Sequence, residues 1–563
     1  ELTCNHCIVI DPTVSKLWRE LSEHVSFLET LSLKQLLNEE SSRVEDLSFE
    51  IGNLHVDFSK QLITKETINK LVALGNDLNL SERINGLFAG EIVNVSENRP
   101  ALHTALRFSE GSNEEVDRVV REEFDRASDF SLLVRSGKWV GTTGKPINTV
   151  INIGIGGSHL GPLMADAALR PFRNETIKSK FVSNIDPADI DSKLHLLDPE
   201  TTMFIINSKS FTTSETITNA EAAIHWLTTS LGTEKDLLRQ HVVAVTANPT
   251  AAKNLGIPKE NIFTIWDWVG GRFSICSSVS LAVMISIGPE NFQLLLDGAN
   301  SIDEHFKSTD LSENIPVLMA LIAIWNRNFL DYGNHALLSY SEDLKYFPSY
   351  LEQLEMESNG KQFRVDGGKI THHTSPVILG RVGTDAQHSF FQLLHQGTTT
   401  IPSDFIVFCK PPMSSHALPE ETMLKQHEAL VVNCFAQSEA LAVGSGRKSG
   451  ELNSDGNRPS TTILGTRLDP YTLGQLVALY EHKVFTMGAI WQINSFDQEG
   501  VQIGKILAAD IGNDLSLNEN LSDHDASTRS LLSLYQQRRR RWGVGIGGGV
   551  ADELWPPALE PQL

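Results

Sequence analysis

The stretch Thr149-Val-Ile-Asn-Ile-Gly-Ile-Gly-Gly-Ser-His-Leu-Gly161 contains the transition that decides the fold. Its β-branched start predicts a buried strand over 149–155, its glycines predict a tight loop at 156–158, and an amphipathic helix is expected over 159–169. The same order recurs in two further units, with strands and helices expected at 203–207 and 213–229, and at 241–247 and 250–255. Strands that alternate with helices in this way predict a parallel sheet with right-handed crossover connections.

A second series of strands and helices follows, so the sequence predicts an α/β protein with two halves that divide near residue 286. The second half is expected to contain strands at 335–341, 376–379, 404–409 and 461–464, and helices at 316–330, 341–358, 384–395, 420–443 and 471–491. Residues 1 to about 125 are polar and are expected to be helical. We therefore expect four regions: an N-terminal helical segment that packs on the second domain (1–125), a smaller α/β domain (126–285), a larger α/β domain (286–510), and a C-terminal arm with a mobile, polar tail (511–563).

The composition is that of an ordinary globular protein rather than a disordered, fibrous or membrane-spanning chain. Of the 563 residues, 40% are hydrophobic and 21% are charged. The longest strongly apolar run, at 317–325, is about half of the ~20 residues that a membrane helix needs. Asp and Glu outnumber Lys and Arg by 70 to 47, and the net charge of −23 repels phosphate backbones and anionic lipids. We expect neither nucleic acid nor membrane as a partner, and an anionic substrate would need locally concentrated cations.

The five cysteines predict no disulfide scaffold, because their number is odd and their density is low. This favours a reducing compartment, and we expect a cytoplasmic location. Cys4-Asn-His-Cys7 lacks a second ligand pair at a spacing that would complete a zinc site, so ordinary thiols and no metal are expected. The sequence starts at Glu1 without the basic-then-apolar pattern of a signal peptide, and the removal of a leader stays open.

Three loops between expected strands and helices carry the chemical signal, because sites in α/β sheets lie where strands end. In the first, 154–161, the third glycine of a dinucleotide fingerprint would fall at His159, so the pattern does not support a NAD site. Its glycine-rich turn still exposes backbone N–H groups for oxygen ligands, although a tight turn without a ligand has the same sequence. In another, 266–274, two glycines allow a close approach of the backbone and Arg272 supplies a cation. A surface arginine in an ordinary turn is the alternative there.

The remaining loop, Ser208-Lys-Ser-Phe-Thr-Thr-Ser-Glu-Thr216, gathers six hydroxyls and one lysine around an expected helix N-terminus. Hydroxyls, backbone N–H groups and the helix dipole are what a phosphate monoester needs for binding. An N-cap rich in Ser and Thr is the alternative, but capping requires only one or two of these hydroxyls. Because G-x-x-x-x-G-K-[ST] is absent, we expect a phosphate site that is not a nucleotide P-loop.

Helical spacing brings together three further sets of polar side chains. Gln353 and Glu357 are four residues apart near the end of the helix expected at 341–358. The other two sets are His388, Gln392 and His395 on the helix expected at 384–395, and Gln498, Gln502 and Lys505 after Phe496-Asp497. A lone His or Glu on a helix is more often structural, so the case for function rests on their combination.

Two segments resemble the signatures of the glucose-6-phosphate isomerase family: Asp267-Trp-Val-Gly-Gly-Arg-Phe-Ser-Ile-Cys-Ser-Ser-Val-Ser280 and Ser495-Phe-Asp-Gln-Glu-Gly-Val-Gln-Ile-Gly-Lys505. Other segments resemble the family in its own order, at 154–162, 208–216, 356–361, 387–388, 395–398, 456–459, 480–483 and 524–528. Together they extend from about residue 97 to residue 528. So many motifs in one order make the resemblance specific, whereas any single loop would not.

The resemblance implies two sugar-isomerase domains, each a doubly wound parallel sheet, in a homodimer. It also implies the reversible interconversion of glucose 6-phosphate and fructose 6-phosphate, as in glycolysis and gluconeogenesis. The reaction would proceed by ring opening and by proton transfer through a cis-enediolate, without a cofactor or a metal. The small-molecule partner is therefore expected to be a sugar phosphate.

The resemblance assigns roles residue by residue. Glu357 moves the proton between C1 and C2, and Arg272 stabilises the enediolate. His388, with Lys505 nearby, opens the sugar ring, and in the family this histidine comes from the partner subunit. The remaining assignments are binding roles: Ser208, the Lys209 backbone, Ser210 and Thr213 hold the phosphate, and Gly157, Ser158, Gln353 and Gln498 hold sugar oxygens.

The sequence departs from the family pattern at three places. Gln502 stands where the family signature has Glu, on the expected helix face of Lys505. Arg381 stands where the family often has an acidic residue, and Asp385-Ala386 replaces Asn-Gly, so the loop before His388 is expected to differ in geometry. Two alternatives to a glucose-6-phosphate isomerase stay open: a sugar-phosphate sensor, which would not need the catalytic set, and an isomerase of another phosphosugar such as mannose 6-phosphate.

Overall fold

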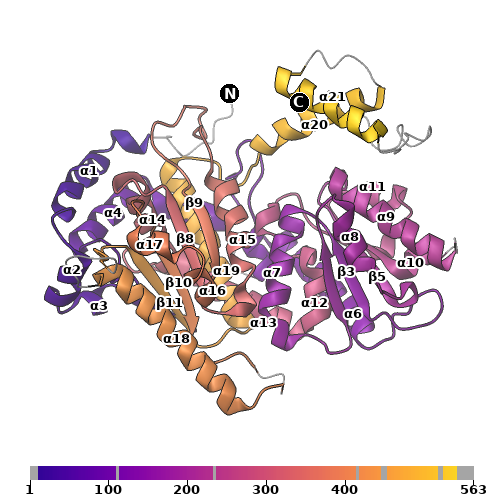
Figure 1. The fold of residues 1–563 in the computed structure, drawn as a ribbon, viewed down its shortest axis with the longest axis horizontal. Coiled ribbons are helices and arrows are strands. Elements are labelled where there is room, and N and C mark those ends of the chain that lie inside the picture. The colour runs from indigo at the N-terminus through magenta and orange to yellow at the C-terminus, as the bar shows by residue number, and fades with distance from the viewer. Residues whose placement is uncertain are drawn as a thin grey trace. The chain divides into compact units, whose positions relative to one another are not determined.

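The computed structural model of the chain describes residues 11–108, 113–232, 236–413, 417–445, 453–517 and 524–541. It divides into two units, Glu1–Asp497 and Gln498–Leu563, and each is described by itself. The first unit holds two β-sheets with helices on both faces (Figure 1). The expected α/β class with two mostly parallel sheets is therefore confirmed. Among the described residues, no helix has both the length and the apolar character that crossing a membrane requires.

The first sheet is entirely parallel, with the strand order β4-β3-β5-β6-β7. Its strands are β3 (Thr149–Ile153), β4 (Lys178–Val182), β5 (Thr202–Asn207), β6 (Val242–Thr246) and β7 (Ile262–Thr264). One face packs on α8 (Pro187–Leu194), α9 (Ser214–Leu231), α10 (Leu237–His241) and α11 (Pro249–Asn254); the other packs on α6 (Glu114–Arg135), α7 (Leu160–Ala168) and α12 (Leu281–Ile287). Alternate side chains of each strand enter the two cores, as Val150 and Ile151 do.

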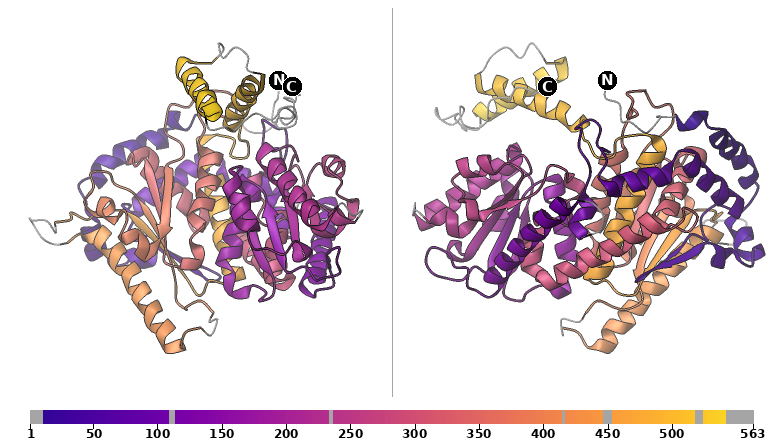
Figure 2. Two further views of the ribbon diagram at one scale, coloured as in Figure 1. Left: turned by 45° about the vertical axis from the view of Figure 1, so that its right-hand side comes forward. Right: turned by 180° about the vertical axis from the view of Figure 1, so that it is seen from behind.

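The second sheet has the strand order β1-β2-β11-β10-β8-β9. Its strands are β1 (Ser48–Ile51), β2 (Leu54–Asp57), β8 (Asn334–Ser339), β9 (Val377–Val382), β10 (Ser403–Phe408) and β11 (Ser460–Gly465), of which the last four are parallel. One face packs on α16 (Gly383–Gln387), α17 (Phe391–Gln396) and α18 (Glu420–Val443), and the other packs on α13 (Pro289–Ser308), α14 (Ile315–Ile324), α15 (Phe347–Leu351) and α19 (Pro470–Trp491). Helix α19 is the centre of the largest core, since every residue in it except Tyr471 is buried. Figure 2 shows this layering from two further sides.

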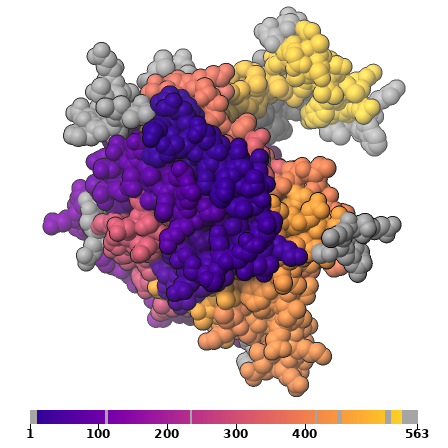
Figure 3. Space-filling view, turned by 90° about the vertical axis from the view of Figure 1, so that its left-hand side faces the viewer, coloured from indigo at the N-terminus to yellow at the C-terminus, as the bar shows by residue number. Residues whose placement is uncertain are grey.

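The N-terminal segment is less helical than its polar sequence predicts. It forms α1 (Lys16–Leu28), α2 (Leu33–Glu39), α3 (Arg43–Asp46), α4 (Lys65–Asp77) and α5 (Leu80–Ala89), but β1 and β2 interrupt this series as an antiparallel hairpin. The alternation of Leu54 and Val56 with polar neighbours gives β2 a buried face, and β2 pairs with β11 at the edge of the second sheet. This segment covers a broad face of the first unit (Figure 3).

Two helices expected from the sequence are broken in the structure. The segment 341–358 is a 3₁₀ turn (Glu342–Leu344), then α15, then a π-turn (Glu352–Glu357), and Pro348 lies in the first turn of α15. The segment 384–395 divides into α16 and α17, with His388 just after the first. The expectation that His388, Gln392 and His395 share one helix face is therefore wrong. Instead, His395 contacts Gln437, and Gln392 donates to Gln396.

The second unit contains α20 (Gly500–Leu517) and α21 (Ala526–Arg541). Gln498 precedes α20 rather than lying on it, so the expected alignment of Gln498 with Gln502 and Lys505 on one helix does not hold. The four arginines at 538–541 form the end of α21. Most of the tail that was expected to be mobile, from residue 542 onward, lies outside the described residues, as do Cys4 and Cys7.

Candidate active site

In the first unit, the loop that contains Gly157 packs directly against the backbone of the loop that contains Gly271. A Cβ atom added to Gly157 would lie 2.1 Å from the carbonyl C and O of Gly271 and 2.7 Å from the Arg272 nitrogen. Gly156 adopts φ of +58°, and its added Cβ would lie 3.1 Å from the Gln353 Nε2 atom. Ser158 ends the same 3₁₀ turn, and its carbonyl accepts from Asn152. The turn after β3 therefore lies against the Arg272 loop and beside Gln353.

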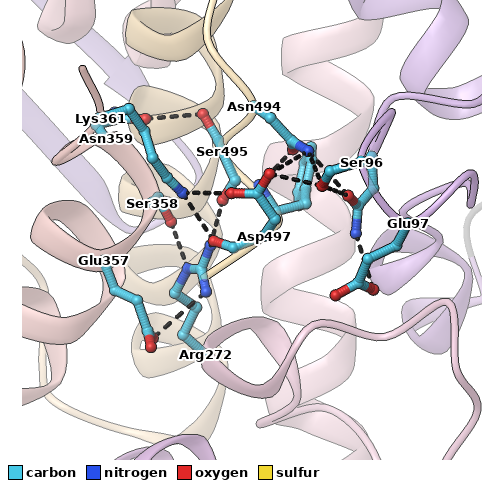
Figure 4. Close-up of polar contacts among 12 residues, drawn as sticks. Ser96, Glu97, Arg272, Glu357, Ser358, Asn359, Lys361, Asn494, Ser495 and Asp497 are labelled. Carbon is cyan, nitrogen blue, oxygen red and sulfur yellow. Dashed lines mark hydrogen bonds and ion pairs between the residues drawn. The ribbon is translucent and has the colours of Figure 1, made fainter. Parts of the chain in front are cut away.

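Arg272 is almost fully buried and is held from several sides (Figure 4). Its Nε donates to Ser358 Oγ at 2.6 Å, and its Nη2 donates to the carbonyls of Ser495 at 2.5 Å and Asp497 at 3.0 Å. Its Nη1 lies 3.3 Å from Glu357 Oε2. Burial lowers the pKa of Arg272, while Glu357 and Asp497 oppose that change. Because the ordinary pKa of arginine is so high, the group is a fixed cation whose Nη1 faces a carboxylate.

Glu357 lies at the end of the π-turn, where its carboxylate is held yet partly open. Gln353 Nε2 donates to Glu357 Oε2 at 2.9 Å, which confirms that these two side chains face each other. The Glu357 side chain keeps 26% of its exposure, against 1% for Arg272. Gln353 Oε1 is buried and has no hydrogen-bond partner among the described residues. The Glu357 carboxylate can accept a proton. The Gln353 Oε1 atom, which has no hydrogen-bond partner among the described residues, can accept a hydrogen bond from a hydroxyl.

The hydroxyl-rich loop after β5 leads directly into α9, with Thr213 at the N-cap. Ser208 is buried, and its hydroxyl accepts from the Phe211 N–H and contacts Thr213 Oγ1. Ser210 is exposed and accepts from both the N–H and the hydroxyl of Thr212. The Thr213 side chain forms no capping bond to its own helix. Ser208 therefore shapes the loop, while Ser210 and Thr213 stand at the helix N-terminus where an anion is favoured.

The Lys209 side chain points to the Arg272 loop rather than contributing to a free cationic surface. Its Nζ donates to the carbonyls of Asp267 at 2.6 Å and Val269 at 3.0 Å, and burial lowers its pKa. The Lys209 carbonyl accepts from the Thr246 hydroxyl. The Lys209 side chain therefore connects the hydroxyl-rich loop to the loop that carries Arg272.

His388 lies exposed at the end of α16. Among the described residues, no hydrogen bond or ion pair joins its ring to Glu357. Just before it, Arg381 Nε lies 2.5 Å from Asp385 Oδ2, so the two residues that depart from the family pattern form an ion pair with each other.

Gln498 and Lys505 belong to the second unit, which begins at Gln498. Lys505 and Gln502 are exposed on α20. Among the described residues, no three His, Cys, Asp or Glu side chains are arranged to hold a metal ion. Cys276, Cys409 and Cys434 are free thiols.

The sequence motifs alone do not reveal the groups that hold Arg272 in place, which are Ser358 and the carbonyls of Ser495 and Asp497. They also do not reveal Lys361, which donates to the Asp497 carbonyl. A signal was present, because 356–361 and 495–505 were both recognised as family segments. Within those segments, the family resemblance implies roles only for Glu357, Gln498 and Lys505. The contacts of Lys361 and Asp497 depend on loops that are far apart in the sequence, and spacing alone does not reveal them.

Comparisons with known proteins identify the family of the chain. Residues 57–532 match the family model described as phosphoglucose isomerase. A glucose-6-phosphate isomerase of Deinococcus deserti is 45% identical over 543 residues, covering 94% of this chain and 99% of the relative. A glucose-6-phosphate isomerase of Corynebacterium glutamicum is 44% identical over 547 residues, covering 94% of this chain and 100% of the relative. The crystal structure of a glucose-6-phosphate isomerase from Chlamydia trachomatis superposes with a TM-score of 0.82 at 33% identity, covering 94% of this chain and 100% of that one.

The resemblance drawn from the sequence motifs is thereby confirmed over most of the chain. The match includes both glycine loops, the hydroxyl-rich loop and the segment of Glu357. On the strength of this coverage and of these relatives, the chain belongs to the phosphoglucose isomerase family.

Proposed function

We propose that this chain interconverts glucose 6-phosphate and fructose 6-phosphate, with Glu357 as the base and Arg272 as the fixed cation. Family membership supports the activity. The observation that carries the residue assignment is the position of the buried Arg272 Nη1, 3.3 Å from a carboxylate that is still partly open. A partly exposed carboxylate beside a buried cation supplies the proton acceptor and the fixed positive charge that this reaction needs.

The central step moves one proton between neighbouring carbons. Glu357 removes the proton from C2 of the open-chain aldose and returns it to C1. The hydroxyl proton passes from O2 to O1, so the C1 carbonyl becomes a hydroxyl and the C2 hydroxyl becomes a carbonyl. Negative charge develops on oxygen in the enediolate between these steps. The Arg272 guanidinium is fixed by Ser358 and by two carbonyls before substrate arrives, so it can stabilise that charge without reorganising.

Binding groups on either side hold the sugar in register. We propose that Gln353 Oε1 accepts a hydrogen bond from a sugar hydroxyl. The turn at Gly157 and Ser158 is proposed to bind further sugar oxygens. Ser210, Thr213 and the Lys209 backbone are proposed to hold the phosphate at the N-terminus of α9, with Ser208 shaping their loop. Binding energy from the remote phosphate then fixes C1 and C2 beside Glu357.

Ring opening needs a group that gives and takes protons near neutral pH, which suits histidine. We propose that His388 performs this step across the interface of a homodimer. The support is the resemblance to the family, together with the exposed position of His388 at the end of α16. Gln498 and Lys505 are proposed to contribute a sugar contact and a cation near the ring oxygen. All steps move protons only, so the proposal needs no cofactor, and a cytoplasmic location fits the cysteine content.

The test is an assay of purified protein with fructose 6-phosphate as substrate, in which glucose 6-phosphate is detected by a coupled dehydrogenase. EDTA is present throughout, and mannose 6-phosphate is supplied in parallel. Turnover of fructose 6-phosphate that EDTA leaves unchanged supports the proposal. Failure of a folded dimer to turn it over, or loss of activity with EDTA that Mg²⁺ or Zn²⁺ restores, would contradict it.

A further inference from the structure

The carboxylate of Asp497 joins three distant segments of the first unit at one point (Figure 4). Its Oδ2 accepts from Ser96 Oγ at 2.6 Å and from Asn494 Nδ2 at 2.8 Å, and its Oδ1 accepts from Lys361 Nζ at 2.7 Å. Asp497 itself is only 8% exposed. A buried carboxylate with three donors is well satisfied, so these bonds hold the loop at 494–497 in one geometry.

That loop supplies the acceptors that grip Arg272. The carbonyls of Ser495 and Asp497 both accept hydrogen bonds from Arg272 Nη2. The Asp497 carbonyl also accepts from Lys361 Nζ at 2.7 Å. Two cations thus share one carbonyl oxygen. The Asp497 carboxylate offsets their repulsion, because it pairs with Lys361 directly. Without that charge, Lys361 would compete with Arg272 for the same oxygen.

The direction of the Arg272 guanidinium follows from this loop. Ser358 accepts from its Nε, and the carbonyls of the loop at 494–497 accept from its Nη2. These contacts leave Nη1 facing Glu357. We propose that Asp497 and Lys361 are positioning residues for Arg272, which set the edge of the guanidinium toward the reacting oxygens. This inference rests on the proposed role of Arg272 in isomerisation and adds two residues to which no role had been given.

Asp497→Asn is the sharpest perturbation because it keeps the shape of the side chain and removes its charge. Whichever way the amide turns, its NH₂ group meets a donor, either the Lys361 ammonium or the Asn494 amide. A shift of about 1 Å in a catalytic group can cost roughly 100-fold in rate. We therefore expect kcat to fall by about 100-fold, while KM changes little because the hydroxyl-rich loop that binds the phosphate is untouched.

The decisive comparison repeats the substitution in an Arg272→Ala background, assayed at high enzyme concentration. If Asp497 acts through Arg272, Asp497→Asn lowers kcat strongly in the parent and hardly at all when Arg272 is absent. Equal losses in both backgrounds would overturn the inference, and so would a folded Asp497→Asn enzyme with parental kcat. Lys361→Met is expected to lower kcat in the same way, and its combination with Asp497→Asn should be no worse than the poorer single variant.

Asp189→Asn is the matched control, because Asp189 also pairs with a lysine, Lys193, and accepts two further hydrogen bonds. It should lower the melting temperature without lowering the kcat of the folded protein. If Asp497→Asn does not fold, Lys361→Met in the two Arg272 backgrounds gives the same test with the same contrary outcomes. The parent chain is assayed first: absence of isomerase activity there contradicts the proposed function, whereas parental activity with insensitive variants contradicts only this inference.

Discussion

Replacing Gly157 with alanine should push the turn at 156–158 away from the loop that carries Gly271 and Arg272. The added Cβ would lie 2.1 Å from the carbonyl of Gly271, while ordinary van der Waals contacts begin at 3.4 Å. The two backbones must therefore part by about 1.3 Å. The atoms in the way are main chain and cannot rotate aside, so the displacement passes to Arg272 as the next residue.

A shift of about 1 Å in a catalytic group costs on the order of 100-fold in rate, so kcat of Gly157→Ala should fall by at least about that factor. The measurement is steady-state kinetics in both directions, with circular dichroism and a melting curve to establish that the variant is folded. Gly333→Ala is the matched control, because nothing lies within 4 Å of its added Cβ. A folded Gly157→Ala enzyme with a kcat near that of the parent would refute the close approach of the two loops as a requirement for catalysis.

Two further predictions address the phosphate and the dimer. Ser210→Ala combined with Thr213→Ala should raise KM and also lower kcat, because the phosphate grip holds the reacting carbons in register, and unchanged kinetics would remove this loop from the site. If His388 acts across a homodimer, mixing inactive His388→Ala and Glu357→Gln subunits should restore roughly a quarter of parental activity, since about half of the dimers are mixed and each has one intact site. No recovery after verified subunit exchange would place each complete site within one chain.

The parts of the fold that the sequence predicts well are those with a strong local signal. The apolar β-branched runs at β3, β5 and β6, and the long apolar helix α19, lie within a few residues of their expected bounds. β4 and β7 were missed, because β4 carries Lys178 and Lys180 and β7 has only three residues. The hairpin β1–β2 was missed for a different reason: its stability comes from pairing with β11, four hundred residues later.

The site shows the same division between local and long-range information. The contact between Gln353 and Glu357 follows from their spacing and persists even though the helix is a π-turn there. The direction of the Lys209 ammonium could not be predicted, because its acceptors are carbonyls of another loop. The same holds for Asp497 and Lys361, whose partners come from three segments. Residue types and spacing thus predict which side chains within one helix or loop lie together, whereas contacts between loops that are far apart in the sequence do not follow from spacing.

The most direct test of the proposed mechanism is the transfer of a proton by Glu357. Glucose 6-phosphate deuterated at C2 is converted in water, and deuterium at C1 of the fructose 6-phosphate is quantified by NMR. The parent enzyme should carry part of the label from C2 to C1 and lose the rest to solvent. Glu357→Gln keeps the size and loses the base, so kcat should fall by roughly 10²–10⁴-fold and transfer of label should cease, while substrate still binds. A Glu357→Gln enzyme with nearly parental kcat and intact transfer of label would contradict the mechanism at its centre.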